Sequence, residues 1–352
     1  MSVGASFGGS WYAYVQQQQL IDSIYPSVAV LIVYLSGSLI SYVRTESEKK
    51  QVRSAFAQYL SPALVEQLAD EPERLQLGGE TREMTFLFCD VRGFTTISET
   101  FKSNPHGLTR LINRLLTPLT NVILDRRGTI DKYMGDCIMA FWNAPLDDET
   151  HAADACASAL QMYVALESLN NEREKEAAEA GEPYLPLNVG IGINTGECVV
   201  GNMGSDQRFD YSVLGDPVNL AARLEGQSKS YGVDTVLGEE TVIQIGDQFA
   251  TLELDLIAVK GKTEAVTIFC LYGNAERAAR ADFIDHKKTH DAMLCAYRRQ
   301  DWEEARRLIA ECRKKANGEI SEFYDLYEER ILDYLETPPS KDWDGVFVAT
   351  TK

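Results

Sequence analysis

Basic residues are scarce in this sequence, and none occurs before Arg44. The 352 residues include 34 Lys and Arg against 53 Asp and Glu, which gives a formal net charge of −19. Because nucleic-acid phosphates select basic surfaces, this balance argues against a nucleic-acid partner. The missing basic segment at the start argues against a cleaved signal peptide.

Paired cysteines and metal-binding histidine spacings are missing as well. The seven cysteines are scattered, without a Cys-x-x-Cys spacing and without histidine partners. This pattern argues against a zinc site or a disulfide framework. We interpret the cysteines as reduced core residues of a cytoplasmic region, and we assign no catalytic role to the four histidines: His106, His151, His286 and His290.

Charged residues are absent from residues 23–43, a stretch long enough to cross a bilayer as a helix. Arg44, Lys49 and Lys50 follow it, so the positive-inside rule places the rest of the chain in the cytoplasm, at the plasma (inner) membrane. We predict an extracytoplasmic stub over 1–23 and a transmembrane helix over 24–43; a buried helix is the alternative. An outer segment this short has no evident means of export, so we expect the chain to begin near the last span of a longer protein.

The segments on either side of the central region favour helix. Residues 44–80 are polar, with Val52, Phe56 and Tyr59 at helical spacing, which predicts a helical signalling linker able to pair with a second copy. A solvated spacer is the alternative. Residues 274–352 are predicted to form a helical extension, in which one hairpin resembles a tetratricopeptide unit, followed by a tail that packs on the rest.

Strand and helix signals alternate in the central region, residues 81–273. We expect helices near 107–125, 148–180, 216–230 and 239–244. Strands are expected near 84–90, 129–133, 137–142, 187–194, 197–203, 208–213, 234–237, 249–257 and 264–272. The order begins β-α-β-β-α-β, which predicts an α/β (α+β) fold of the ferredoxin-like kind with one sheet face available for a ligand or partner.

Two aspartates stand near glycine at the ends of strand-like segments. Asp90 lies in FCDVRGFT, residues 88–95, and Asp136 closes KYMGD, residues 132–136. A carboxylate at a strand end can reach a hard cation while the strand fixes its direction. Together the two could hold the pair of Mg²⁺ or Mn²⁺ ions of a phosphoryl or nucleotidyl transfer. Either aspartate alone is as readily interpreted as a turn residue.

Further motifs follow in order: TIDKYMGD at 129–136, GIGINTG at 190–196 and YSVLGDPVNLAARL at 211–224. Over about residues 81–272 this series resembles the class III nucleotidyl cyclase catalytic domain. The resemblance implies a ferredoxin-like core that works as a homodimer, with two active sites at the subunit interface. It also implies a reaction in which the ribose 3′-hydroxyl attacks the α-phosphorus and pyrophosphate leaves.

The resemblance also implies the site residues. The metal ligands would be Asp90, Asp136 and the backbone carbonyl of Val91, with two Mg²⁺ or Mn²⁺ ions per site. Asn219 and Arg223 match the transition-state pair; they are four residues apart and therefore share one helix face. The alternative for Arg223 is a surface salt bridge with Glu225 or its neighbours. The remaining positions would bind the substrate. Lys132 and Ser212 would contact the base, and the phosphates would be bound by Gly93, Phe94, Thr95, Lys262 and Arg208.

Base choice rests on two of these positions. The hydroxyl of Ser212 can accept from the adenine amino group or donate to the guanine oxygen. Lys132 favours ATP, because its ammonium can donate to the adenine ring nitrogen, whereas guanine presents an N–H there. The expected function is a membrane-anchored adenylate cyclase, which resembles receptor cyclases with a CHASE-type sensor.

Three alternatives remain in view. A guanylate cyclase is disfavoured by Lys132. A silent cyclase-like module for dimerisation or nucleotide sensing should lack a metal or transition-state residue, and none is missing. A diguanylate cyclase should carry a Gly-Gly-Asp/Glu-Glu-Phe signature, which the sequence does not contain.

Overall fold

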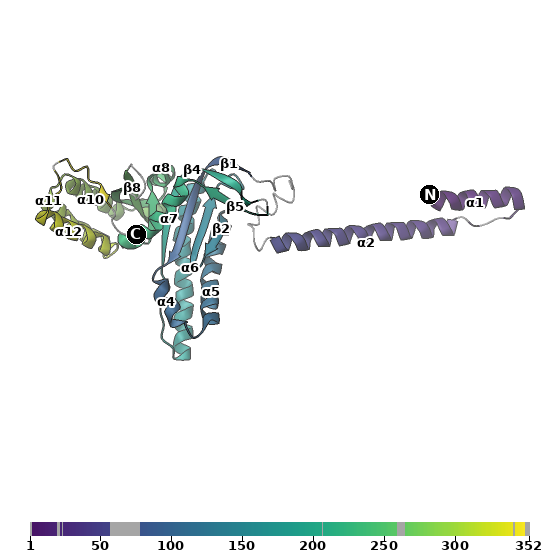
Figure 1. Cartoon of the computed structure of the whole chain (residues 1–352), viewed down its shortest axis with the longest axis horizontal. Helices are drawn as coiled ribbons and strands as arrows, with labels where there is room; N and C mark the ends of the chain where they lie inside the picture. Colours follow the sequence, from purple (N-terminus) through teal and green to yellow (C-terminus); the bar gives the residue numbers. More distant parts are fainter. Residues whose placement is uncertain are drawn as a thin grey trace. The chain divides into compact units, whose positions relative to one another are not determined.

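The computed structural model describes residues 2–19, 22, 24–56, 78–205, 207–258, 265–340 and 342–348 (Figure 1). The chain divides into two compact units, residues 1–72 and 73–352. Residues 57–77 of the expected linker lie outside the described residues.

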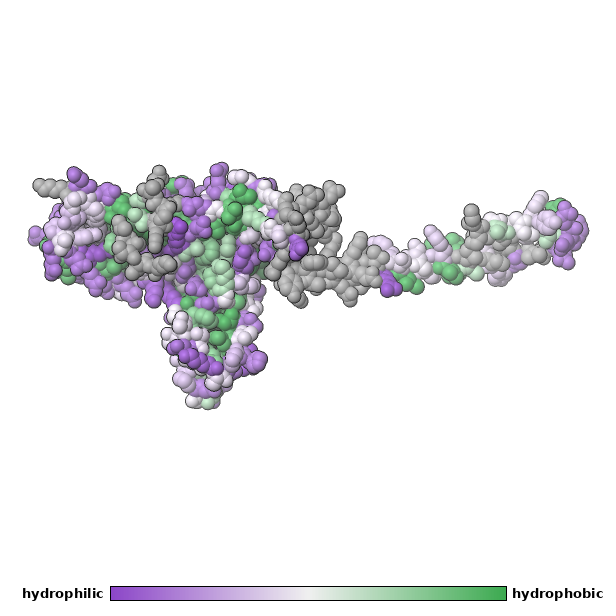
Figure 2. Space-filling model, in the orientation of Figure 1, coloured by the Kyte–Doolittle hydropathy of each residue, from purple (hydrophilic) through white to green (hydrophobic). Residues whose placement is uncertain are grey.

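The described part of the first unit holds two helices that contact each other, α1 (Ser2–Gln17) and α2 (Ile24–Phe56). No helix was predicted over the first of these segments. Within the described residues, α2 holds the one candidate membrane span, Ser27–Arg44, with a mean hydropathy of 1.6. Apolar side chains gather along α2 in Figure 2, and Val33 is 72% exposed. The helix continues past the predicted span to Phe56, so the start of the linker is helical.

The second unit is built on one mixed sheet with the strand order β2-β3-β1-β4-β6-β8-β7-β9, and β5 pairs with β4 outside this path. The first strands are β1 (Gly78–Val91), β2 (Thr129–Met134), β3 (Cys137–Trp142), β4 (Val189–Ser205) and β5 (Arg208–Leu214). The others are β6 (Thr235–Gly238), β7 (Ala250–Ala258), β8 (Ala265–Gly273) and β9 (Phe347–Val348). The predicted ferredoxin-like α/β fold is confirmed.

Helices cover both faces of this sheet, so the expectation that one sheet face stays available for a ligand or partner was wrong. Those of the central region are α4 (Phe94–Thr100), α5 (Pro105–Asp125), α6 (His151–Ala180), α7 (Asp216–Ser230) and α8 (Glu239–Ile245). Alternation along β1 sends Leu87 and Cys89 toward the core beneath α5 and α6, which run side by side in Figure 1. Phe86 and Phe88 point to the other face, in a cluster that includes Ala221 of α7. The end of β1 therefore lies between two packed layers.

The C-terminal helices share a core with the sheet. A short turn α9 (Ala275–Ala278) leads to α10 (Ala281–Arg298), α11 (Trp302–Ala316) and α12 (Ser321–Glu336). Tyr297 and Tyr327 are buried in one cluster with Leu254 and Ile268 of β7 and β8. The tail packs on the C-terminal helices and the sheet, as expected. The ring centroid of Trp343 lies 5.5 Å from that of Tyr297 in α10, and β9 pairs with β7.

Two further expectations were wrong. The segments 187–194 and 197–203 form one continuous strand, β4, because β1 pairs with it without interruption from Gly78 to Val91. The cysteines are not all core residues, since Cys295 is exposed and Cys137 is half-buried.

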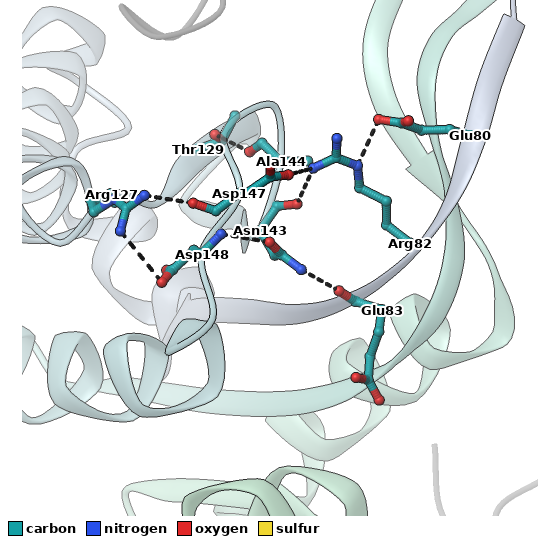
Figure 3. A network of polar contacts seen from close by, with 9 residues as sticks. All are labelled: Glu80, Arg82, Glu83, Arg127, Thr129, Asn143, Ala144, Asp147 and Asp148. Atoms are coloured by element: carbon teal, nitrogen blue, oxygen red, sulfur yellow. Dashed lines mark hydrogen bonds and ion pairs between the residues drawn. The ribbon is translucent and has the colours of Figure 1, made fainter.

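The start of β1 is tied to the loop after β3 by a polar network (Figure 3). Arg82 donates to Asp147 Oδ1 at 2.7 Å and to the Asn143 carbonyl at 3.1 Å. Asn143 Nδ2 donates to the Glu83 carbonyl at 2.9 Å, and its Oδ1 accepts from the Asp148 N–H at 2.7 Å. One amide side chain therefore joins β1 to this loop.

Asn143→Ala should lower the free energy of unfolding by about 1–2 kcal/mol, because two backbone groups lose their side-chain partner. Asn143 has a φ of 72°, which asparagine tolerates better than alanine. Asn143→Gly removes this backbone strain but not the loss of the hydrogen bonds, so it should recover only part of the stability that Asn143→Ala loses. Asp147→Ala is the control, since that side chain is 89% exposed. If urea unfolding gave the same stability for Asn143→Ala and Asp147→Ala, the central role of Asn143 in this network would be contradicted.

Candidate active site

The fold brings Asp90 and Asp136 together. Asp90 is the penultimate residue of β1, and Asp136 follows Gly135, whose φ of 70° makes the tight turn between β2 and β3. Cys89 of β1 lies opposite Ile138 of β3. The turn that holds Asp136, which directly precedes β3, therefore lies beside the end of β1. Two local features, a strand end and a glycine turn, thus meet at one edge of the sheet.

The charges at this edge repel one another. Burial raises the pKa of Asp90 to about 6, helped by the charge of Asp136 and by a hydrogen bond between the two carboxyl groups. Burial likewise raises the pKa of Glu225 on α7 to about 7, and the charge of Asp90 adds to the effect. A partly buried carboxylate whose pKa is raised is stabilised in its charged form by a nearby cation.

The donor set suits a hard divalent ion, because carboxylate and carbonyl oxygens are what Mg²⁺ and Mn²⁺ prefer. Val91 ends β1 next to Asp90, and its N–H donates to the Asp90 carboxylate. Among the described residues no cluster of three His, Cys, Asp or Glu side chains is arranged to hold a metal. An aspartate pair would leave the further ligand positions of a bound ion to substrate and water.

A turn follows directly and leads into the short helix α4. Gly93 has a φ of 68°, a left-handed conformation that suits glycine. Its carbonyl accepts from the N–H groups of Thr96 at 3.0 Å and Ile97 at 3.2 Å, so α4 starts at Phe94. The predicted phosphate-binding residues Gly93, Phe94 and Thr95 thus form the junction between β1 and α4.

Asn219 and Arg223 lie on α7, which begins after Gly215 with Pro217 in its first turn. Asn219 is exposed and Arg223 is half-buried. The Nη1 atom of Arg223 is buried and has no hydrogen-bond partner among the residues that the structure describes. The predicted alternative, an ion pair with Glu225, is not formed. An unsatisfied guanidinium nitrogen suits an anionic ligand.

Lys132 and Ser212 come from different strands and meet through a third residue. Ser212 of β5 donates to Asp131 Oδ2 at 2.7 Å, and Lys132 Nζ of β2 lies 3.1 Å from Asp131 Oδ1. The structure therefore places the two predicted base-binding residues at one location. Asp131 belongs to the TIDKYMGD motif but had no predicted role, and Glu225, which lies near the aspartate pair, was not predicted as a site residue.

Two predicted phosphate-binding residues remain predictions. Arg208 begins β5, but its side chain is not among those described. Lys262 lies in 259–264, outside the described residues.

Comparisons with known proteins identify the family of the central region. The family model of the adenylate and guanylate cyclase catalytic domain matches residues 79–273. The chain is 35% identical over 225 residues to an adenylate cyclase of Anabaena cylindrica, covering 62% of this chain and 43% of that protein. It is 33% identical over 192 residues to adenylate cyclase 1 of Rhizobium meliloti (strain 1021), covering 54% of this chain and 28% of that protein. The chain thus spans less than half the length of these curated relatives.

A solved structure supports the same assignment. The crystal structure of the adenylyl cyclase CyaB from P. aeruginosa matches with a TM-score of 0.50 and 33% sequence identity, covering 56% of this chain and 97% of that chain. The family match runs from β1 to β8 and includes every predicted site residue. The chain belongs to the class III adenylate and guanylate cyclase catalytic-domain family.

Proposed function

We propose that this chain is an adenylate cyclase that converts ATP to 3′,5′-cyclic AMP and pyrophosphate. The observation that carries the proposal is the meeting of Asp90 and Asp136 at the end of β1, inside the region that matches the cyclase family. Two relatives named adenylate cyclase, at 35% and 33% identity, support the choice of reaction.

Asp90, Asp136 and the Val91 carbonyl would hold two Mg²⁺ or Mn²⁺ ions, which would make the ribose 3′-hydroxyl a better nucleophile and neutralise the triphosphate. Arg223 would bind a phosphoryl oxygen with its planar fork as negative charge builds. Asn219 would orient the ribose from the same helix face. The phosphates would also contact the Gly93–Phe94–Thr95 junction, Arg208 and Lys262.

Lys132 supports ATP over GTP. Its ammonium carries only donors, which complement the adenine ring nitrogen and face a guanine N–H unfavourably. Its side chain is 44% exposed, so the ammonium remains accessible to a base.

We further propose a homodimer that is anchored in the plasma (inner) membrane by α2, with its catalytic region in the cytoplasm. Val199 and Leu214 are directly paired across β4 and β5 and are 38% and 68% exposed, an apolar pair that a second copy would cover. The apolar Ser27–Arg44 segment supports the anchor.

The experiment is product analysis by chromatography after the purified chain receives ATP or GTP separately, with Mg²⁺ or Mn²⁺. We expect cyclic AMP from ATP. Lys132→Glu should lower the ratio of kcat/KM for ATP over GTP by about tenfold or more, because the carboxylate accepts from the guanine N–H. Cyclic GMP as the main wild-type product would mean a guanylate cyclase. Neither product from a folded dimer would mean a silent module.

A further inference from the structure

Asp131 is a buried carboxylate at an irregular point of β2. Its side chain is 0% exposed. The register between β2 and β3 shifts between Ile130 and Lys132, so Asp131 is the extra residue of a β-bulge. Bulges interrupt the alternation of side chains and re-aim them, and they are frequent beside active sites. Here the interruption lets the Lys132 ammonium lie 3.1 Å from the carboxylate of its own neighbour.

The two oxygens of Asp131 have different partners. Oδ2 accepts the hydroxyl proton of Ser212 at 2.7 Å. Oδ1 is buried and accepts no hydrogen bond from the described part of the chain, so the Lys132 ammonium is its compensating charge. A buried carboxylate is costly without such partners, and it therefore holds both of them in place.

The contact with Asp131 settles which role the Ser212 hydroxyl can take toward a base. A hydroxyl has one proton and two lone pairs, and that proton is directed to Asp131. Ser212 is then left to accept a hydrogen bond from its other side. The 6-amino group of adenine can donate to such an acceptor, whereas the 6-oxo group of guanine cannot.

We propose that Asp131 is a specificity-determining positioning residue, which fixes Ser212 as an acceptor and holds Lys132 in place so that the site selects a 6-aminopurine. This inference rests on the proposed function, because it concerns the same base-binding site. Asp131 acts through Ser212 and Lys132 and need not touch the base.

Asp131→Asn is the most informative substitution, because it keeps the side-chain volume. Lys132 carries only donors and would attract the amide oxygen, which turns the amide NH₂ toward Ser212. The Ser212 proton would then be directed outward, toward a base. The variant should therefore accept a 6-oxopurine better than the wild type does.

The test measures dissociation constants of the full chain for the α,β-methylene analogues of three nucleotides: ATP, GTP and purine riboside 5′-triphosphate, which lacks the 6-amino group. In the wild type we expect ATP to bind about tenfold or more tightly than either of the others. Asp131→Asn should remove most of both preferences, and Asp131→Ala should do the same to a lesser extent. Ser212→Ala should remove the preference for the 6-amino group, and adding Asp131→Asn to it should remove no more of that preference.

Glu179→Ala, an exposed carboxylate of α6, is the control and should keep both ratios. The inference fails if Asp131→Asn keeps both ratios within about twofold, or if it weakens all three nucleotides equally, as a merely structural residue would. Turnover of ATP by the wild type tests the proposed function separately. If the wild type binds without turnover, the proposed function fails, and the binding ratios still decide the inference.

Discussion

A mixed dimer of Asp90→Ala and Arg223→Ala subunits should form cyclic AMP, although each variant alone should lose about 10³-fold or more in kcat/KM. Asp90 belongs to the aspartate pair that it forms with Asp136, and the buried Nη1 of Arg223 has no hydrogen-bond partner among the described residues. If the active site takes these residues from different subunits, the mixed dimer has one complete site and one site lacking both. Tandem purification of two differently tagged full-length chains should then give about half the wild-type specific activity.

The control uses two substitutions in the same half-site. A mixed dimer of Asp90→Ala and Asp136→Ala has no complete site in either arrangement and should stay inactive. Absence of activity in the Asp90→Ala with Arg223→Ala dimer, once its composition is proven, would contradict a shared interface site. Full activity of either homodimer would contradict the assigned role of its residue.

Much of the fold follows from local signals in the sequence. The strand predicted at 137–142 matches β3, and the helix predicted at 216–230 matches α7, because Gly215 and Pro217 mark its start. The break predicted inside β4 was wrong because Asn194, Thr195 and Gly196 favour a turn locally. In the fold they pair with β1, which extends the strand through them.

The site could be predicted only in part, because its polar contacts join distant segments. Asp90 and Asp136 could be paired from their strand ends and glycines. The hydrogen bond from Ser212 to Asp131 joins residues 81 apart and depends on a bulge that no residue type announces. Glu225 was interpreted only as a surface partner of Arg223, since sequence does not show which face of α7 meets β1.

The C-terminal helices are joined to the helix that carries Asn219 and Arg223 by a buried ion pair. Arg330 of α12 donates to Asp255 Oδ2 of β7 at 2.6 Å, and their side chains are 8% and 1% exposed. Tyr231, which caps the C-terminus of α7, donates to the same oxygen at 2.7 Å. The Arg330 guanidinium also lies 3.5 Å from the ring centroid of Phe347 in β9. One carboxylate therefore connects α7 and α12.

Arg330→Met should lower the free energy of unfolding by about 3–5 kcal/mol, because it leaves the Asp255 carboxylate buried without its cation. The substitution keeps an unbranched side chain of similar length, so the loss reports mainly the missing charge and hydrogen bond. Arg307→Met on α11 is the matched control, since Arg307 pairs with Glu304 at an exposed position and its loss should matter far less. Urea unfolding followed by tryptophan fluorescence would measure the free energy of unfolding of both variants, because Trp302 and Trp343 pack in the same core cluster as α12. Equal stability of the two variants would show that the buried pair adds nothing, and that apolar packing alone holds the helices to the sheet.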